Sequence, residues 1–185
     1  MAILSGWSRC AARIAGFILI VPLAGTAHAD NAALEAAIKA AYVPKLAPFV
    51  TWPAQEKADG AFDLCVSGSD EVTKLLPQSA AGQQVNGRAI QVRQLADGAD
   101  TQGCQILYVA NSPATPQMLA AVRGKPVLTV IDGVQSAHGI VQFVVVQDHV
   151  RFNIDNGLAT AAGLAISSKL LGLANAVTPG PQDKP

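Results

Sequence analysis

Few side chains in this sequence could carry acid, base or nucleophilic chemistry. Of its three histidines, His28 lies near the amino terminus, so His138 and His149 are the remaining groups that titrate near neutral pH. His138 falls in a glycine-containing loop, and His149 at a predicted hairpin tip where water is its expected partner. Because neither histidine belongs to a catalytic motif, we predict no catalytic residue and no enzymatic activity.

Metal and phosphate binding are equally poorly supported. Structural zinc usually takes four closely spaced Cys or His ligands, which the distant cysteines of this chain cannot supply. The stretch 66–69 leads from a predicted strand into a predicted helix, but it lacks the lysine and glycine spacing of a phosphate loop. Asp70 and Glu71 would repel an anion there. We therefore predict no metal and no cofactor, and assign this loop to helix capping.

The amino terminus has the pattern of a secretory signal peptide. Arg9 and Arg13 precede an apolar run at residues 14–25, and Ala27-His28-Ala29 then gives a cleavage pattern. The run is shorter than the roughly 20 apolar residues that span a bilayer, so an uncleaved anchor is the less favoured alternative. We predict cleavage after Ala29, export to the periplasm and no membrane insertion of the mature chain.

The charge balance argues against nucleic acid as a partner. Removing Arg9 and Arg13 lowers Lys plus Arg from 13 to 11 while Asp plus Glu stays at 13, so the net charge falls to −2. Nucleic-acid binding requires clustered positive charge. Cys10 leaves with the leader, and the two cysteines that remain, Cys65 and Cys104, favour one disulfide in an exported chain. Two buried free thiols are the alternative.

The elements that must position these residues alternate between helices and apolar strands. We predict a helix over 31–43 that kinks or breaks near Tyr42 to Pro44, followed by a short turn that carries Phe49 and Trp52. The remaining predicted helices cover 69–80, capped by Ser69, 114–123, and 155–175, capped by Asp155 with a bend near Gly163. Predicted strands cover 61–68, 105–110 and 126–132, with hairpins at residues 86–87 and 147–149.

This pattern predicts a single α/β domain over residues 30–175, with a disordered tail at 176–185. The expected architecture is a three-layer sandwich with a mixed, mostly parallel sheet and helices on both faces. An aromatic stripe at helical spacing usually belongs to the core, and we assign Phe49 to it. Trp52 directly precedes Pro53, where the helix must end, which favours a partly exposed position and contact with a partner.

Several stretches, taken in order, resemble the YfiR family of periplasmic proteins over about residues 34–175. They are KAAYVPKLAPFVTWP, FDLCVSG, VNGRAIQVRQL, CQILYVA, GKPVLTVID and the closing HGIVQFVVVQDHVRFNIDNGLATAAGLAISSKLLGLA. The resemblance implies an α/β sandwich that tends to dimerise, and it supports the Cys65–Cys104 disulfide. Two departures are Pro44 and Pro48 in the first helix and the lack of any cysteine after Cys104.

The resemblance also implies a non-enzymatic regulator. Such proteins bind the periplasmic sensor portion of a membrane diguanylate cyclase and hold the cyclase inactive, which lowers cyclic di-GMP and disfavours biofilm growth. For this chain we predict partner contacts at Trp52, Gly133 and His138. The alternative hypothesis is a periplasmic small-molecule receptor whose pocket lies at the carboxyl ends of the parallel strands. Its rim would comprise residues 66–69, 110–112 and 132–133.

Overall fold

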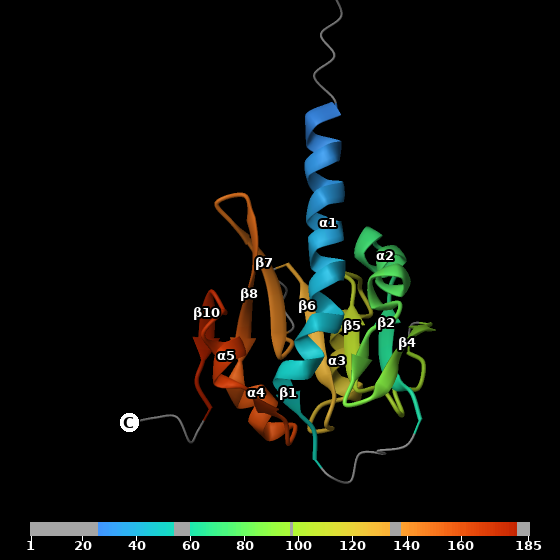
Figure 1. The fold of residues 1–185 in the computed structure, drawn as a ribbon, viewed down its shortest axis with the longest axis vertical. Helices are drawn as coiled ribbons and strands as arrows, with labels where there is room; N and C mark the ends of the chain where they lie inside the picture. Colours follow the sequence, from blue (N-terminus) through green and yellow to red (C-terminus); the bar gives the residue numbers. More distant parts are fainter. Residues whose placement is uncertain (1–25, 54–59, 97, 134–137, 181–185) are drawn as a thin grey trace, which may run out of the picture.

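The computed structural model describes residues 26–53, 60–96, 98–133 and 138–180 (Figure 1). Most of the predicted leader therefore lies outside the described residues, as does the end of the predicted tail. None of the helices in the described part of the chain is long and apolar enough to cross a membrane.

An eight-stranded sheet forms the centre of the fold. Its strand order is β10-β8-β7-β6-β5-β2-β4-β3, and neighbouring strands are parallel except in the pairs β7–β8 and β3–β4. The strands are β2 (Phe62–Ser67), β3 (Gln84–Val85), β4 (Arg88–Leu95), β5 (Ile106–Val109), β6 (Leu128–Asp132), β7 (Val141–Val146), β8 (His149–Asp155) and β10 (Ala176–Thr178). This mixed, mostly parallel sheet confirms the predicted fold class.

Helices cover both faces of this sheet. The helices are α1 (Thr26–Leu46), η1 (Ala47–Phe49), α2 (Glu71–Ala80), α3 (Thr115–Ala121), α4 (Asn156–Ala161) and α5 (Ser168–Leu171). Because side chains alternate along a strand, β2 contributes Leu64 and Val66 to the core under α1 and α2, and Cys65 to the core under α3. The two cores give the three layers visible in Figure 1.

Both predicted hairpins are confirmed. Asn86 and Gly87 link β3 to β4 with φ of 51° and 79°, the left-handed pair that a tight hairpin requires and that Asn-Gly adopts readily. Gln147 and Asp148 link β7 to β8 with φ of 51° and 60°. The β7–β8 hairpin and the amino-terminal half of α1 both extend beyond the body of the sheet (Figure 1).

Of the kink or break predicted near Pro44, the break is wrong. Helix α1 continues to Leu46, and the second short turn follows as η1, which leads into the two-residue strand β1 (Val50–Thr51). Val43, Leu46 and Ala47 are almost fully buried on either side of the proline. Burial of this helix end against the sheet stabilises helical backbone that local propensity disfavours.

The predicted cap of α2 is displaced by one residue. Asp70, not Ser69, is the N-cap, and its Oδ1 accepts hydrogen bonds from the backbone N–H of Thr73 at 2.7 Å and from its hydroxyl at 2.6 Å. Gly68 turns the chain with φ of 100°, and a Cβ there would lie 2.5 Å from that of Ala110. This turn leaves Ser69 outside the helix.

The predicted helix over 155–175 is also wrong beyond its first turns. Asp155 caps α4 as expected, accepting from Leu158 N–H at 2.8 Å, but Gly163 then adopts φ of 73° and the chain leaves the helix. Ala165–Ile166 form strand β9, which pairs antiparallel with β1, before α5 begins. Ala176–Thr178 then pair with β8 as β10, so these residues do not belong to a disordered tail; residues 181–185 lie outside the described part.

Candidate functional site

The disulfide is confirmed. Cys65 in β2 and Cys104 just before β5 are bonded, with 5.7 Å between their Cα atoms, and both are buried on the α3 face. The Nη2 of Arg93 lies 3.3 Å from each sulfur and donates to the carbonyl of Gln102 at 2.7 Å. The bond therefore ties two central strands together beneath a fixed guanidinium group.

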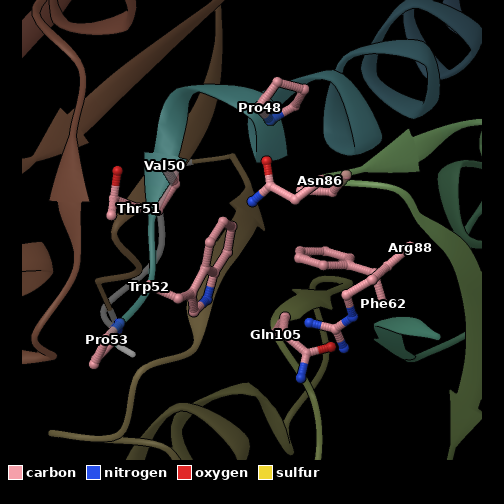
Figure 2. Close-up of a pocket in the computed structure, with 10 residues that line it drawn as sticks. Pro48, Val50, Thr51, Trp52, Pro53, Phe62, Asn86, Arg88 and Gln105 are labelled. Carbon is pink, nitrogen blue, oxygen red and sulfur yellow. The ribbon is translucent and has the colours of Figure 1, made fainter. Parts of the chain in front are cut away.

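Trp52 lines a cavity of about 360 Å³ at the edge of the sheet where β2, β4 and β5 begin (Figure 2). Its ring packs edge-on against Phe62 with 5.2 Å between ring centroids, and Trp52 is partly buried. The indole Nε1 is buried and has no hydrogen-bond partner among the described residues. The sequence predicted the partial exposure of this side chain but not the cavity beside it.

Arg88 and Gln105 lie across this cavity from Trp52 (Figure 2). Arg88 donates from Nε to the carbonyl of Gly60 at 3.1 Å and from Nη2 to that of Ala61 at 2.5 Å, and its guanidinium lies 5.5 Å from the centroid of the Phe62 ring. Gln105 accepts the backbone N–H of Asp63 through Oε1 at 2.7 Å. Sequence analysis missed both residues, because their approach depends on the register of three strands.

Gly133 and His138 do not line the cavity beside Trp52. Gly133 follows the carboxyl end of β6, the opposite edge of the sheet, where its N–H donates to Phe143 O at 3.1 Å and its carbonyl accepts from Gln142 Nε2 at 2.7 Å. Its φ of 72° favours glycine. His138 is exposed and lines a separate cavity of about 80 Å³ between α3 and α4. The structure thus distributes the three predicted contact residues over separate surfaces.

Buried charges occupy the carboxyl edge of the parallel strands. Lys39 of α1 is 5% exposed and pairs with Glu35 and with Asp132 at the end of β6, both at 2.5 Å. Burial lowers the pKa of Lys39, but the hydrogen bonds and charges of the two carboxylates outweigh it and raise this pKa above its usual value. The Glu35–Lys39 spacing was visible in the sequence, whereas the pairing across to Asp132 was not.

Tyr108 completes this edge. Its hydroxyl donates to Asp70 Oδ2 at 2.7 Å, and burial, followed by the charge of Asp70, raises the pKa of the phenol. Of the rim predicted for a small-molecule receptor at this edge, Asp132 takes part in these pairs, whereas Ser67 has a buried hydroxyl with no hydrogen-bond partner among the described residues. The cavity beside Trp52 lies at the other edge.

An apolar groove lies between the amino-terminal half of α1 and the β7–β8 hairpin. Leu34 on α1 is 61% exposed and Val145 on β7 is 49% exposed, and the two side chains line the same groove. The groove has a volume of about 250 Å³ and is lined by Asn31, Leu34, Glu35, Ile38, Val145, Asp148 and Val150. Exposed apolar surface of this kind commonly marks an interaction site.

The arrangement defines a class of protein: an α/β sandwich with one disulfide, a polar cavity and an apolar groove. Among the described residues, no group of three or more His, Cys, Asp or Glu side chains could hold a metal ion. Residues 36–175 match the model of the family DUF4154, described as YfiR/HmsC-like. Because the match spans more than half of the chain, this protein belongs to the YfiR/HmsC-like family. No curated protein matches the chain.

Proposed function

We propose that this protein is an exported, non-enzymatic regulator that binds the periplasmic sensor domain of a membrane diguanylate cyclase and holds the cyclase inactive. Membership of the YfiR/HmsC-like family is the observation that carries the proposal. The proposal includes cleavage of the leader after Ala29 and action in the periplasm. Mass spectrometry of the secreted product tests the cleavage, since the mature chain must begin at Asp30.

The groove between α1 and the β7–β8 hairpin is the docking surface that we assign to the cyclase. Its lining combines aliphatic side chains with polar ones, and the charged residues among them, Glu35 and Asp148, are both acidic. A partner segment that places apolar side chains in the groove and basic side chains beside it would match this surface in shape and charge. The occupant is therefore a basic, partly apolar face of the sensor domain.

A binding assay with matched variants tests this assignment. The mature protein is titrated against the purified sensor domain of a diguanylate cyclase encoded beside it, by calorimetry or surface plasmon resonance. Leu34→Asp should weaken binding by about thirtyfold, the effect of losing a hot-spot side chain worth about 2 kcal/mol. Leu173→Asp is the control, because Leu173 is similarly exposed, at 65%, but lies just after α5. Equal affinities for the two variants would remove the groove from the proposal.

Trp52, Gly133 and His138 remain predicted contacts and are tested in the same titration. His138→Ala changes an exposed side chain, so reduced affinity would indicate direct contact. Absence of micromolar binding by the wild-type protein would count against the regulator function as a whole. Pairing of the protein with itself would appear as a concentration-dependent molecular mass in analytical ultracentrifugation of the protein alone.

A further inference from the structure

We infer that the cavity beside Trp52 binds a small organic carboxylate, with its anionic group held by hydrogen-bond donors and its apolar part against the rings of Trp52 and Phe62. No step of the proposed regulator function requires such a ligand, so this inference stands independently of the partner.

The buried indole nitrogen is the first observation. Nε1 of Trp52 is inaccessible to solvent and has no partner among the described residues. A buried donor without a partner costs free energy, and native proteins keep few of them. A ligand with an acceptor atom in the adjoining cavity would satisfy this donor once the indole ring turns its N–H toward the cavity, because the nitrogen is closed to water in the present side-chain position.

The polarity of the lining is the second observation. Gln105 uses its carbonyl oxygen to accept from Asp63, which leaves its NH₂ group as a donor. Arg88 is oriented by its bonds to two backbone carbonyls, while its Nη1 makes no hydrogen bond to a described residue. None of the described residues that line the cavity is acidic, and Arg88 is the charged one. A donor-rich, positively charged lining favours an anion with acceptor oxygens.

The apolar part of the cavity is the third observation. Trp52, Phe62 and Pro48 supply flat hydrophobic surfaces beside the polar groups, as Figure 2 shows. The volume of about 360 Å³ lies at the small end of the range of roughly 300–1,000 Å³ typical of ligand pockets. An inorganic anion would leave the aromatic surface unused, so a carboxylate that carries a ring or a short aliphatic chain fits better.

Calorimetric titration of the mature protein with defined probes tests the inference. Benzoate and hexanoate supply the carboxylate on a ring and on a chain, benzamide is the neutral counterpart of benzoate, and sulfate is an anion without an apolar part. At least one of the two carboxylates should bind saturably in the millimolar range or below. Benzoate should bind at least about tenfold more tightly than benzamide, because charge-assisted hydrogen bonds are roughly twice as strong as neutral ones.

Tryptophan fluorescence gives a second readout. Trp7 lies in the predicted leader, so Trp52 is the single tryptophan from residue 30 onward, and a carboxylate in the cavity should change its emission. Arg88→Gln should weaken benzoate binding by about tenfold and remove the preference over benzamide. Arg123→Gln, which changes an exposed arginine outside this cavity, should leave the affinity for benzoate and the preference over benzamide unchanged. Trp52→Phe should weaken benzoate by several-fold in calorimetry, since it keeps a ring but loses the N–H.

Three outcomes would overturn the inference. They are no saturable binding of either carboxylate at 10 mM by wild-type protein, equal affinity for benzoate and benzamide, or sulfate binding as tightly as benzoate. The comparison of probes uses the wild-type chain alone, so it decides the question even if Arg88→Gln unfolds. Thermal melting of that variant without ligand shows whether its result is interpretable.

Discussion

Replacing Lys39 by methionine should destabilise the fold substantially. The Lys39 side chain is 6% exposed, and its ammonium group lies 2.5 Å from Asp132, whose side chain is 22% exposed. Removing one partner of a fully buried ion pair costs about 3–5 kcal/mol, because the remaining charge stays buried without compensation. Because Asp132 keeps some contact with water, we expect the loss of its lysine partner to lower the free energy of unfolding by about 2 kcal/mol.

The second carboxylate adds little to this figure. Glu35 is 38% exposed and pairs with Lys39 one helical turn away, an arrangement worth about 0.3–0.5 kcal/mol. Methionine retains most of the buried methylene packing of lysine, so the change isolates the charge. Together these terms predict a loss of about 2–3 kcal/mol in the free energy of unfolding.

Urea denaturation of the mature protein, followed by circular dichroism, measures this loss. With a slope near 2 kcal/mol/M, the midpoint should fall by about 1 M. Lys45→Met is the matched control, since Lys45 is exposed on the same helix, and it should change stability by less than about 0.5 kcal/mol. Combining Lys39→Met with Asp132→Asn should cost clearly less than the sum of the single changes.

The pH dependence gives an independent check. The pKa of Lys39 in the folded protein is raised above 10.5, its usual value. The pair therefore contributes its full stabilisation below about pH 10.5 and loses it only as the pH rises through the folded value. The difference between wild type and Lys39→Met should stay constant from about pH 6 to 9. A variant as stable as wild type, or a difference that vanishes within that window, would refute the argument.

Three further predictions concern stability. Replacing Cys65 and Cys104 by serine should lower the free energy of unfolding by about 4 kcal/mol, the chain-entropy estimate for a crosslink across a 39-residue separation. A urea midpoint of the wild-type protein that does not change when reductant is added would contradict this prediction. Tyr108→Phe should lower the free energy of unfolding by about 1 kcal/mol, because it removes the hydrogen bond to Asp70. Burial raises the pKa of Tyr108 in the folded protein, so its hydroxyl should stay neutral past pH 10 in an ultraviolet titration. The stability linked to this group should decline only above that pH. Gly163→Ala should cost about 1 kcal/mol in thermal or urea unfolding because φ is 73°, and a neutral effect would show that the backbone relaxes there.

Sequence predicted those parts of the fold that are decided locally. The Asn86-Gly87 pair specifies a tight turn by its own conformational preference, and continuous apolar runs specify central strands, so strands β2, β5 and β6 lie within two residues of their predicted bounds. The cap at Asp155 was likewise readable from one side chain and its neighbours. Each of these features depends on interactions within a few residues.

The errors arose where distant segments decide the backbone. The apolar spacing after Asp155 is the same for one bent helix and for two short helices, and what separates α4 from α5 is the pairing of Ile166 with Val50. Pro44 similarly suggested a break that burial of Val43 and Leu46 overrides. Local propensity is a weak guide wherever tertiary contacts of this kind supply the stabilisation.

The distinction between local and long-range interactions also explains which residues of the candidate site could be predicted from the sequence. Trp52 was identifiable because Pro53 forces an extended chain after a helix, which is a local rule. Arg88 and Gln105 reach it only because β4 and β5 flank β2 in a fixed register. No pattern within either segment signals that approach, so the cavity was not predicted.

The two edges of the sheet differ in whether a residue with an unsatisfied polar group lines one of the cavities described above, and this difference favours the amino edge as the ligand site. At the carboxyl edge, Lys39 with its two carboxylates and Tyr108 with Asp70 form interactions that a ligand would have to break. The hydroxyl of Ser67 is also buried there without a hydrogen-bond partner among the described residues, but it lines none of the cavities described above. At the amino edge, the indole of Trp52 retains an unmet donor beside an open volume. Binding at the amino edge adds interactions without removing any, which is why the usual preference of α/β sheets for ligands at the carboxyl ends is reversed in our proposal.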